Sequence, residues 1–215
     1  MSAELPMSGE EMLTTTRSVR RGLDLERAVD PELVKDCLRL ALQAPNGNNR
    51  QKWRWILLTD PRVRANVAEV YRAAFHDRNA AALERLDEVP EGTRSVLTAA
   101  RALADRLHRV PVLVIPCLEL PDGRLPTGNQ AALWASLLPA AWSYALAARS
   151  RGLVTAWTAV HLDREQEVAD LLGLPATVRQ GALLPTAYPL RTTFRPGPRL
   201  PLEEVLHHDG WQGRD

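Results

Sequence analysis

The stretch that decides the fold reads APNGNNRQKWRWILLT and spans residues 44–59. Its second part, residues 53–59, is apolar, aromatic and β-branched, which is typical of a buried strand. Its first part, residues 45–52, sets side-chain amides around one glycine, and these residue types favour a loop. Asp60 and Pro61 then start a helix as its N-cap and first residue. An amide-rich loop therefore leads directly into a core strand.

Helix and strand signals alternate on both sides of this stretch. Ser8 and Glu11 have the spacing of a capping box, which predicts a short helix near the N-terminus. Asp30 and Pro31 cap a second helix, whose apolar residues repeat at helical spacing until Pro45. Further along, we expect helices over about 63–85, 94–108, 129–151 and 163–172, strands over 110–120, 153–157 and 181–190, and a short terminal helix.

Single residues in these segments carry structural predictions. Pro139 is expected to kink the helix 129–151 because it removes one backbone donor. Trp134 and Trp142 lie two turns apart in the same segment and indicate core packing. Asp163 is expected to cap the following helix, and Gly173 to end it. The alternation predicts an α/β (α+β) three-layer fold, in one domain spanning residues 1–215.

Composition argues against several classes of protein. The formal net charge is +1, and the 27 basic residues, of which only Lys35 and Lys52 are lysines, are matched by 26 acidic ones. That balance does not favour a nucleic-acid surface. Cys37 and Cys117 lie far apart, so we expect buried thiols rather than a disulfide or a metal site. The acidic N-terminus has no signal core, and no run approaches the roughly eighteen apolar residues of a membrane span, so we expect a cytoplasmic protein.

Several common catalytic motifs are absent from the sequence. There is no Gly-x-Gly-x-x-Gly after a strand, no phosphate loop ending in Gly-Lys-Ser/Thr and no Gly-x-Ser-x-Gly elbow. The histidines show no metal-ligand spacing. Rossmann, hydrolase and metalloenzyme interpretations are therefore disfavoured.

Three polar segments are not explained by packing. Residues 16–21, TRSVRR, place guanidinium and hydroxyl donors in a short turn, which suits a phosphate; an exposed basic turn is the alternative. The loop at residues 45–52 offers amides that can both donate to and accept from a flavin; an ordinary turn is the alternative. Arg195 and Arg199 lie in a proline-stiffened loop, which taken singly is a solvated linker.

Together and in this order, the segments resemble the nitroreductase family of FMN-dependent oxidoreductases. That family carries an N-terminal Arg-Arg-Ser-x-Arg turn, an Ala-Pro-Ser-Gly-x-Asn-x-Gln-x-Trp loop, a Gly-Leu-x-Thr strand and a late arginine. Here these blocks are TRSVR, APNGNNRQKW, GLVTAW and GPRLPLEEV, and the likeness covers roughly residues 12–208. It implies a nitroreductase-like fold, with a central mixed sheet flanked by helices and a C-terminal extension that embraces the partner subunit of a homodimer.

The resemblance also implies candidate site residues. The N-terminal FMN ligands would be Arg17, Ser18 and Arg20, with Arg199, helped by Arg195, closing on the phosphate. The stretch beside flavin N5 would consist of Trp157, Thr158 and Ala159. The loop that reaches the partner's flavin would contribute Pro45, Asn46, Gly47, Asn49 and Gln51. No side chain is expected to act as a catalytic acid or base, and no metal is expected.

Two residues depart from the family's pattern. Thr16 stands in place of the first arginine of the N-terminal turn, and Asn46 stands in place of the usual serine. Thr16 can donate one hydrogen bond but carries no charge, which makes the C-terminal arginines more important. Trp157 occupies a position where smaller or hydroxyl side chains often occur, so we expect backbone amides to serve N5.

The resemblance implies a ping-pong reaction. NAD(P)H passes a hydride to FMN and leaves, and a small organic acceptor of the nitroaromatic or quinone type then takes its place. Arg20 would stabilise negative charge on the reduced flavin. The alternatives are a biosynthetic dehydrogenase or oxidase, or a reductive dehalogenase, on the same fold; a flavin-binding module without turnover; and an arginine-rich nucleic-acid binder.

Overall fold

The computed structural model describes residues 7–211 and has a five-stranded sheet at its centre. The sheet runs in the order β1-β2-β5-β3, with β4 beside β2. All pairings between these strands are antiparallel, and an isolated parallel bridge joins Ser18 to Thr155. The sheet is therefore mixed only through that bridge. The strands are β1 (Trp53–Leu58), β2 (Val112–Glu119), β3 (Val154–Thr155), β4 (Val178–Gln180) and β5 (Leu184–Ala187).

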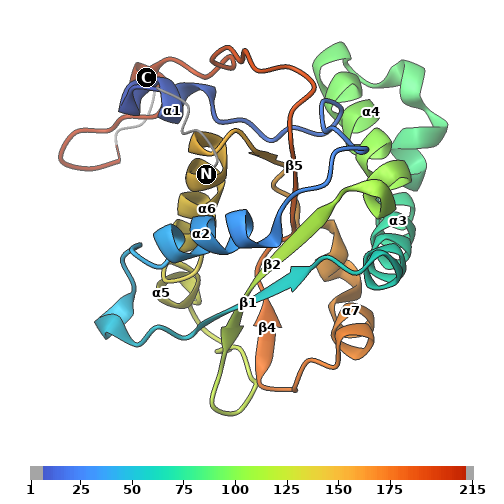
Figure 1. Ribbon diagram of the computed structural model, residues 1–215. Coiled ribbons are helices and arrows are strands. Elements are labelled where there is room, and N and C mark those ends of the chain that lie inside the picture. Colours follow the sequence, from blue (N-terminus) through green and yellow to red (C-terminus); the bar gives the residue numbers. More distant parts are fainter. Residues whose placement is uncertain (1–6, 212–215) are drawn as a thin grey trace.

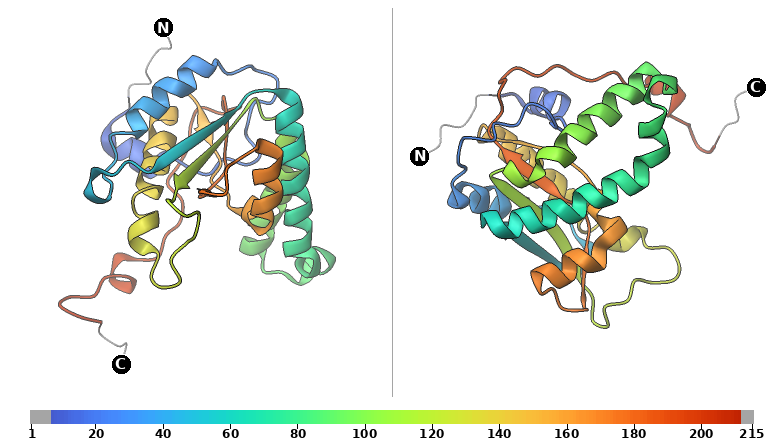
Figure 2. Two further views of the ribbon diagram at one scale, coloured as in Figure 1. Left: turned by 90° about the horizontal axis from the view of Figure 1, so that it is seen from below. Right: turned by 90° about the vertical axis from the view of Figure 1, so that its right-hand side faces the viewer.

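Helices cover both faces of the sheet, which gives the three layers that the sequence predicts (Figure 1; Figure 2). One layer holds α1 (Gly9–Thr15), α2 (Pro31–Ala41), α5 (Ala131–Trp134) and α6 (Leu138–Ser150). The other holds α3 (Pro61–Glu84), α4 (Glu91–Arg106) and α7 (Glu165–Leu172). Short 3-10 turns lie between them: η1 (Gly47–Asn49), η2 (Leu86–Glu88), η3 (Leu107–Arg109), η4 (Val160–Arg164) and η5 (Leu202–Glu204).

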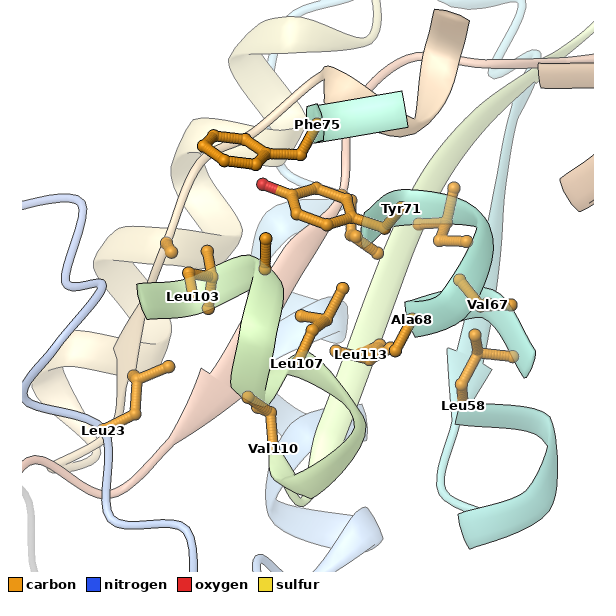
Figure 3. Packing of buried hydrophobic residues seen from close by; sticks show 14 of the residues in the cluster. Leu23, Leu58, Val67, Ala68, Tyr71, Phe75, Leu103, Leu107, Val110 and Leu113 are labelled. Atoms are coloured by element: carbon orange, nitrogen blue, oxygen red, sulfur yellow. The ribbon is translucent and has the colours of Figure 1, made fainter. Parts of the chain in front are cut away.

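Each helical layer packs its own hydrophobic cluster against the sheet. Tyr71 and Phe75 of α3 meet Leu103 of α4 in the first cluster (Figure 3). Val34 of α2 and Tyr144 of α6 belong to the second. Strand β2 contributes to both, because Leu113 and Ile115 face the first cluster while Val112 and Val114 face the second. With both faces covered, β2 reads as a continuous apolar run in the sequence.

The predicted N-caps at Ser8 and Asp30 are confirmed. The Ser8 hydroxyl accepts from the Glu11 amide at 3.0 Å, and the Asp30 carboxylate caps α2 with Pro31 in its first turn. The predicted cap at Asp163 is wrong. Helix α7 begins at Glu165 without a side-chain cap, because Asp163 lies two residues earlier, in η4, and pairs with Arg78 of α3. Gly173 ends α7 in the left-handed region, with φ of +61°, as predicted.

The predicted helix 129–151 is divided rather than kinked. Helix α5 ends at Trp134 and α6 begins at Leu138, so that Pro139 lies in the first turn of a new helix. Proline is tolerated there because the first amides of a helix have no intrahelical acceptor.

Within residues 7–211, the segment Ala131–Ser150 is the one that is long and apolar enough to span a membrane by length and composition. The prediction that no run approaches such a span is therefore wrong, although α6 itself packs on α2 and the sheet.

One side of α6 is not covered by this chain. Trp142 is 39% exposed and Leu138 is 36% exposed, whereas Tyr144 is fully buried. Trp134 is partly buried and packs in a third cluster with Trp53. Core packing is thus confirmed for Trp134 and wrong for Trp142, because α6 presents two different faces and the spacing of two tryptophans does not say which one is covered.

A β-bulge separates β4 from β5 along the same edge of β2. Gln180 pairs with Cys117, and Leu184 pairs with Val114. The chain advances four residues along one strand and three along the other, so one extra residue is accommodated. Beyond the bulge the faces are exchanged: Val178 of β4 belongs to the first cluster, whereas Leu184 of β5, six residues later, belongs to the second, although regular alternation would put both on one face. The sequence predicted one strand over 181–190 and missed β4, which is short and polar.

Candidate functional site

The N-terminal turn lies against strand β3. The Val19 amide donates to the Thr155 carbonyl at 2.9 Å, and Ser18 bridges to the same residue. The Ser18 hydroxyl accepts from the Trp157 amide at 2.8 Å. The turn and the stretch 157–159, which are far apart in the sequence, are therefore held together by hydrogen bonds.

Arg17 connects this turn to the C-terminal loop. Its Nη1 donates to the Arg195 carbonyl at 2.9 Å. Its guanidinium lies against Gly197, where a Cβ atom would meet Nη2 at 2.7 Å, so glycine leaves the room that Arg17 occupies. A cavity of about 760 Å³ lies between the turn and the loop. Among the described residues its lining includes Arg17, Arg21, Arg191 and Arg195 and no Asp or Glu, which suits an anionic group.

Arg20 lies on a different side of the turn from Arg17. Burial raises the pKa of Tyr71, and the hydrogen bond with Thr158 and the charges of Arg20 and Arg78 oppose that rise. The Tyr71 hydroxyl lies 2.9 Å from the Thr158 hydroxyl. Arg20 is therefore near the α3 side of the stretch 157–159, while Arg17 faces the C-terminal loop.

The stretch 157–159 leaves one backbone amide free. The Trp157 amide donates to Ser18, and the Thr158 amide donates to the Leu183 carbonyl at 3.1 Å. The Thr158 hydroxyl is engaged by Tyr71. The amide of Ala159 donates to no acceptor within residues 7–211. It is thus available to a ligand atom that lies against this stretch, whereas the Thr158 side chain points into the core.

The amide-rich loop is held in shape by its own side chains. Asn46 Oδ1 accepts from the Gln51 amide at 3.0 Å, and Gln51 Nε2 donates to Asn49 Oδ1 at 3.1 Å. Asn48, Asn49 and Gln51 have φ of +53°, +50° and +48°, a left-handed conformation that asparagine tolerates better than most residues. Pro45 is exposed at the start of the loop. The asparagines therefore have a conformational role in addition to any role in binding.

The same loop borders a second cavity, of about 310 Å³, which also reaches α5. Gly47 lies on this side, and its amide donates to the Ser136 hydroxyl at 3.0 Å. Asn46 and Gln51 line the cavity as well, and no lining residue is shared with the cavity at Arg17. Within one chain, the structure brings together the N-terminal turn, the stretch 157–159 and the C-terminal loop, but not the amide-rich loop.

Arg199 lies outside the lining of the cavity that Arg195 borders. Its Nη1 donates to the Pro198 carbonyl at 2.8 Å, and its side chain is exposed. The assignment of Arg199 to the FMN phosphate stays a prediction.

The sequence did not identify Tyr71 as a residue that positions the stretch 157–159, because a lone tyrosine in a long helix carries no motif. Within residues 7–211, no group of three or more His, Cys, Asp or Glu side chains could hold a metal ion.

Comparison with known proteins agrees with the geometry. Residues 13–188 match the Nitroreductase family. The chain belongs to the nitroreductase family. Its fold is shared with a mutant form of NfnB, an FMN and NADPH-dependent nitroreductase from Sphigopyxis sp. strain HMH, at 21% identity and a TM-score of 0.70 over 95% of this chain and 100% of that one.

Two other solved structures share the nitroreductase fold with different descriptions. An iodotyrosine deiodinase bound to FMN and 3-iodo-L-tyrosine matches at 20% identity and a TM-score of 0.66, over 94% of this chain and 99% of that one. A BluB-like flavoprotein from Clostridium difficile 630 matches at 18% identity and a TM-score of 0.68, over 95% and 100%. At these identities the likeness shows the fold, which hosts more than one chemistry.

Proposed function

We propose that this nitroreductase-family chain is an FMN-dependent oxidoreductase, which transfers hydride from NAD(P)H to a small organic acceptor of the nitroaromatic or quinone type. When bound, FMN supplies the redox chemistry of a ping-pong cycle, and the protein supplies binding, orientation and electrostatics. Membership of the family supports the reaction class. The observation that carries the proposal is the hydrogen bond from the Trp157 amide to Ser18, because it ties the arginine-lined cavity, which Ser18 borders, to the stretch that holds the free Ala159 amide.

The residues at this site fit the chemistry of FMN. Arg17 and Arg195 line a cavity that is positive and open, as a phosphate requires. Ser18 lies beside them and is fixed by the Trp157 amide. Gly197 gives Arg17 its room. The orphaned Ala159 amide provides a donor for a flavin ring nitrogen, and Arg199 would approach the phosphate from the exposed loop.

The remaining residues position these groups. Tyr71 holds Thr158 by its hydroxyl, so that the direction of the neighbouring Ala159 amide is fixed from the core. Arg20 places a positive charge on the same side, where it would stabilise negative charge on the reduced cofactor. Trp157 is held by Ser18. We assign no catalytic acid or base.

We further propose a homodimer with two composite sites. Several large apolar side chains on the α1, α2 and α6 layer are exposed, such as Leu13 at 63%, Leu40 at 47% and Trp142 at 39%. An apolar surface on one layer is typical of a protein interface. The amide-rich loop borders a cavity of its own. In the dimer, Pro45, Asn46, Gly47, Asn49 and Gln51 would contact the partner's flavin.

We place the protein in the cytoplasm. Cys37 and Cys117 are both buried and unpaired, and burial raises the pKa of the Cys37 thiol to about 11 and of the Cys117 thiol to about 12. Thiols that stay protonated and buried are inert, which is compatible with a reducing compartment.

A visible absorption spectrum of the purified protein tests the cofactor, and heat should release FMN rather than FAD. Anaerobic addition of NADH or NADPH should then bleach the flavin, and a quinone should restore its colour. A colourless protein that takes up no added FMN would overturn the proposal. A yellow protein that neither nicotinamide reduces would instead be a flavin-binding module, and one that reacts with NAD(P)H but not with quinones or nitroaromatics would favour a dehydrogenase or dehalogenase.

A further inference from the structure

Arg21 and Arg191 are two arginines that the proposed function does not use. Both line the cavity of about 760 Å³, and both are exposed to solvent. Within residues 7–211, neither side chain makes a hydrogen bond or an ion pair. Other exposed arginines of this chain pair with a carboxylate, as Arg78 does with Asp163. The donors of Arg21 and Arg191 are therefore free to bind a ligand in the cavity.

The N-terminal turn and the C-terminal loop run antiparallel at one end of this cavity. Leu23 forms an antiparallel bridge with Pro189. The Leu190 amide donates to the Gly22 carbonyl at 2.8 Å. Gly22 and Leu190 both line the cavity. The two segments are therefore held in a fixed register where the cavity begins.

This register places Arg21 opposite Arg191. Each arginine lies one residue beyond the contact between Gly22 and Leu190, on the side of the cavity. Residues directly opposite in an antiparallel pair have Cβ atoms about 5 Å apart, and like charges there are destabilising. Among the described residues, the lining of the cavity has no Asp or Glu that could separate the two charges. An anion bound between the two guanidinium groups would remove this repulsion.

A second arginine pair, Arg17 and Arg195, lies at the other end of the cavity. Arg17 donates to the Arg195 carbonyl. On each segment, four residues separate this contact from Arg21 and Arg191. The volume of the cavity is typical of a complete small-molecule site. It therefore has room for a second anionic group besides the phosphate that the proposed function places at Arg17 and Arg195.

The proposed reaction supplies one further ligand that carries phosphate groups. A nicotinamide dinucleotide contains a diphosphate, and NADPH has an additional phosphate on one ribose. Acceptors of the nitroaromatic or quinone type need carry no anionic group. When the nicotinamide stacks on the flavin, the rest of the dinucleotide has to extend towards solvent. Exposed arginines suit that part of the ligand, because guanidinium groups bind phosphates through charge-assisted and often bidentate hydrogen bonds.

We propose that Arg21 and Arg191 form a second anion site, which binds a phosphate group of the nicotinamide dinucleotide. The inference rests on the proposed function, because that function supplies the dinucleotide. It assigns no contact with FMN to either arginine, so donor binding and cofactor binding depend on different residues. The diphosphate and the 2′-phosphate are the two sources of this chemistry, and NADH and NADPH distinguish them.

The first test is a calorimetric titration of the FMN-loaded variants Arg21→Gln and Arg191→Gln with NAD⁺ and NADP⁺, which bind without reducing the flavin. Each variant should bind the dinucleotide roughly tenfold more weakly than wild type, as loss of one charge-assisted hydrogen bond predicts. The affinity of the apoprotein for FMN, measured by fluorescence, should stay unchanged. A loss confined to NADP⁺ would assign the site to the 2′-phosphate, and an equal loss for both would assign it to the diphosphate.

Reduction of the bound flavin gives a second measurement. In anaerobic stopped-flow experiments, the concentration of the donor that gives half of the maximal rate should rise in both variants by the same factor as the dissociation constant. The maximal rate should stay unchanged, because Arg21 and Arg191 contact a phosphate and not the nicotinamide ring.

Arg106→Gln is the matched control. Arg106 lines a small cavity together with Arg21, so the variant removes the same charge from the same neighbourhood. Arg106 does not line the large cavity, and its variant should bind FMN and both dinucleotides as wild type does. An effect of Arg106→Gln as large as that of Arg21→Gln would mean that net charge rather than contact determines the affinity, and the inference would be wrong.

The remaining outcomes separate this inference from the proposed function. If FMN affinity fell together with dinucleotide affinity, the arginine pair would belong to the cofactor site and the inference would be overturned. If the purified protein took up no FMN, or if neither NADH nor NADPH reduced it, the proposed function would fall and the inference with it. If wild type reacted with either donor while Arg21→Gln and Arg191→Gln bound both dinucleotides normally, only the inference would fall.

Discussion

The hydroxyl groups of Tyr71 and Thr158 lie 2.9 Å apart in the core and join helix α3 to the stretch that carries the free Ala159 amide. Both side chains are buried. Neither hydroxyl can therefore turn to water if the other is removed, and this contact couples the stability of the protein to the geometry of the proposed flavin site.

Tyr71→Phe should lower the free energy of unfolding by about 1–3 kcal/mol, because it leaves the Thr158 hydroxyl buried without this partner. Thr158→Val should have an effect of the same order. The double variant should lose less than the sum of the two, since each change removes the same bond. Urea unfolding of the apoprotein measures all three. Strict additivity would show that the two hydroxyls do not interact.

Arg199→Ala should weaken FMN binding by roughly ten- to a hundredfold while leaving riboflavin binding unchanged. The C-terminal loop is exposed and is not part of the core, so the fold should be retained. Fluorescence titration with both flavins gives the comparison. Loss of the two flavins in equal measure would mean that Arg199 acts on the ring or on the structure rather than on the phosphate.

Trp142→Glu should dissociate the proposed homodimer, because it places a charge in the uncovered apolar face of α6. Light scattering should report a monomer, and FMN should be lost because each site would need the partner's amide-rich loop. Leu171→Glu is the matched control, since Leu171 is 46% exposed on α7 in the other layer. A monomeric wild type that holds FMN tightly would contradict the composite site.

His161 should make the protein less stable as the pH falls. Burial lowers its pKa from 6.5 to about 4, against a smaller opposing effect of the Asp163 charge, and neither ring nitrogen has a hydrogen-bond partner among the described residues. Between these values the unfolded chain binds a proton that the folded chain does not, so stability is full above pH 6.5 and declines towards pH 4. The decline should amount to roughly 3 kcal/mol.

His161→Phe is the variant that checks this pH dependence, because it keeps an aromatic ring of similar size without a titrating group. Unfolding curves measured at several values between pH 7 and pH 4 should be flatter for the variant than for wild type. Parallel curves would mean that His161 is paired or hydrated in solution and titrates normally.

Local sequence signals predicted some helix ends correctly and others wrongly. Ser8, Asp30 and Gly173 act as sequence rules require, since capping depends on residues within one turn. Asp163 follows the same rule and fails, because Arg78, far away in sequence, offers an ion pair. Trp142 shows the same limit: spacing reveals an apolar residue but not which helix face the chain leaves uncovered.

For the candidate site, too, the sequence identified some residues and missed others. The motif residues Arg17, Ser18 and Trp157 are found together, because a short turn and a strand carry recognisable patterns. Tyr71 carries none, since a side chain on a helix acquires its role only from what the fold sets against it.

The bulge between Gln180 and Leu184 gives this part of the chain an unusual sensitivity to length. Leu183, inside this segment, is the residue that bridges to Thr158. Deleting one residue from the bulge would exchange the two faces of β5, send Leu183 towards the opposite helical layer and rotate the neighbouring backbone with it. Replacing a side chain here changes one contact, whereas removing one peptide unit would turn every side chain of the strand next to the proposed site to the other face. Insertions and deletions in residues 180–184 should therefore be tolerated far less than substitutions.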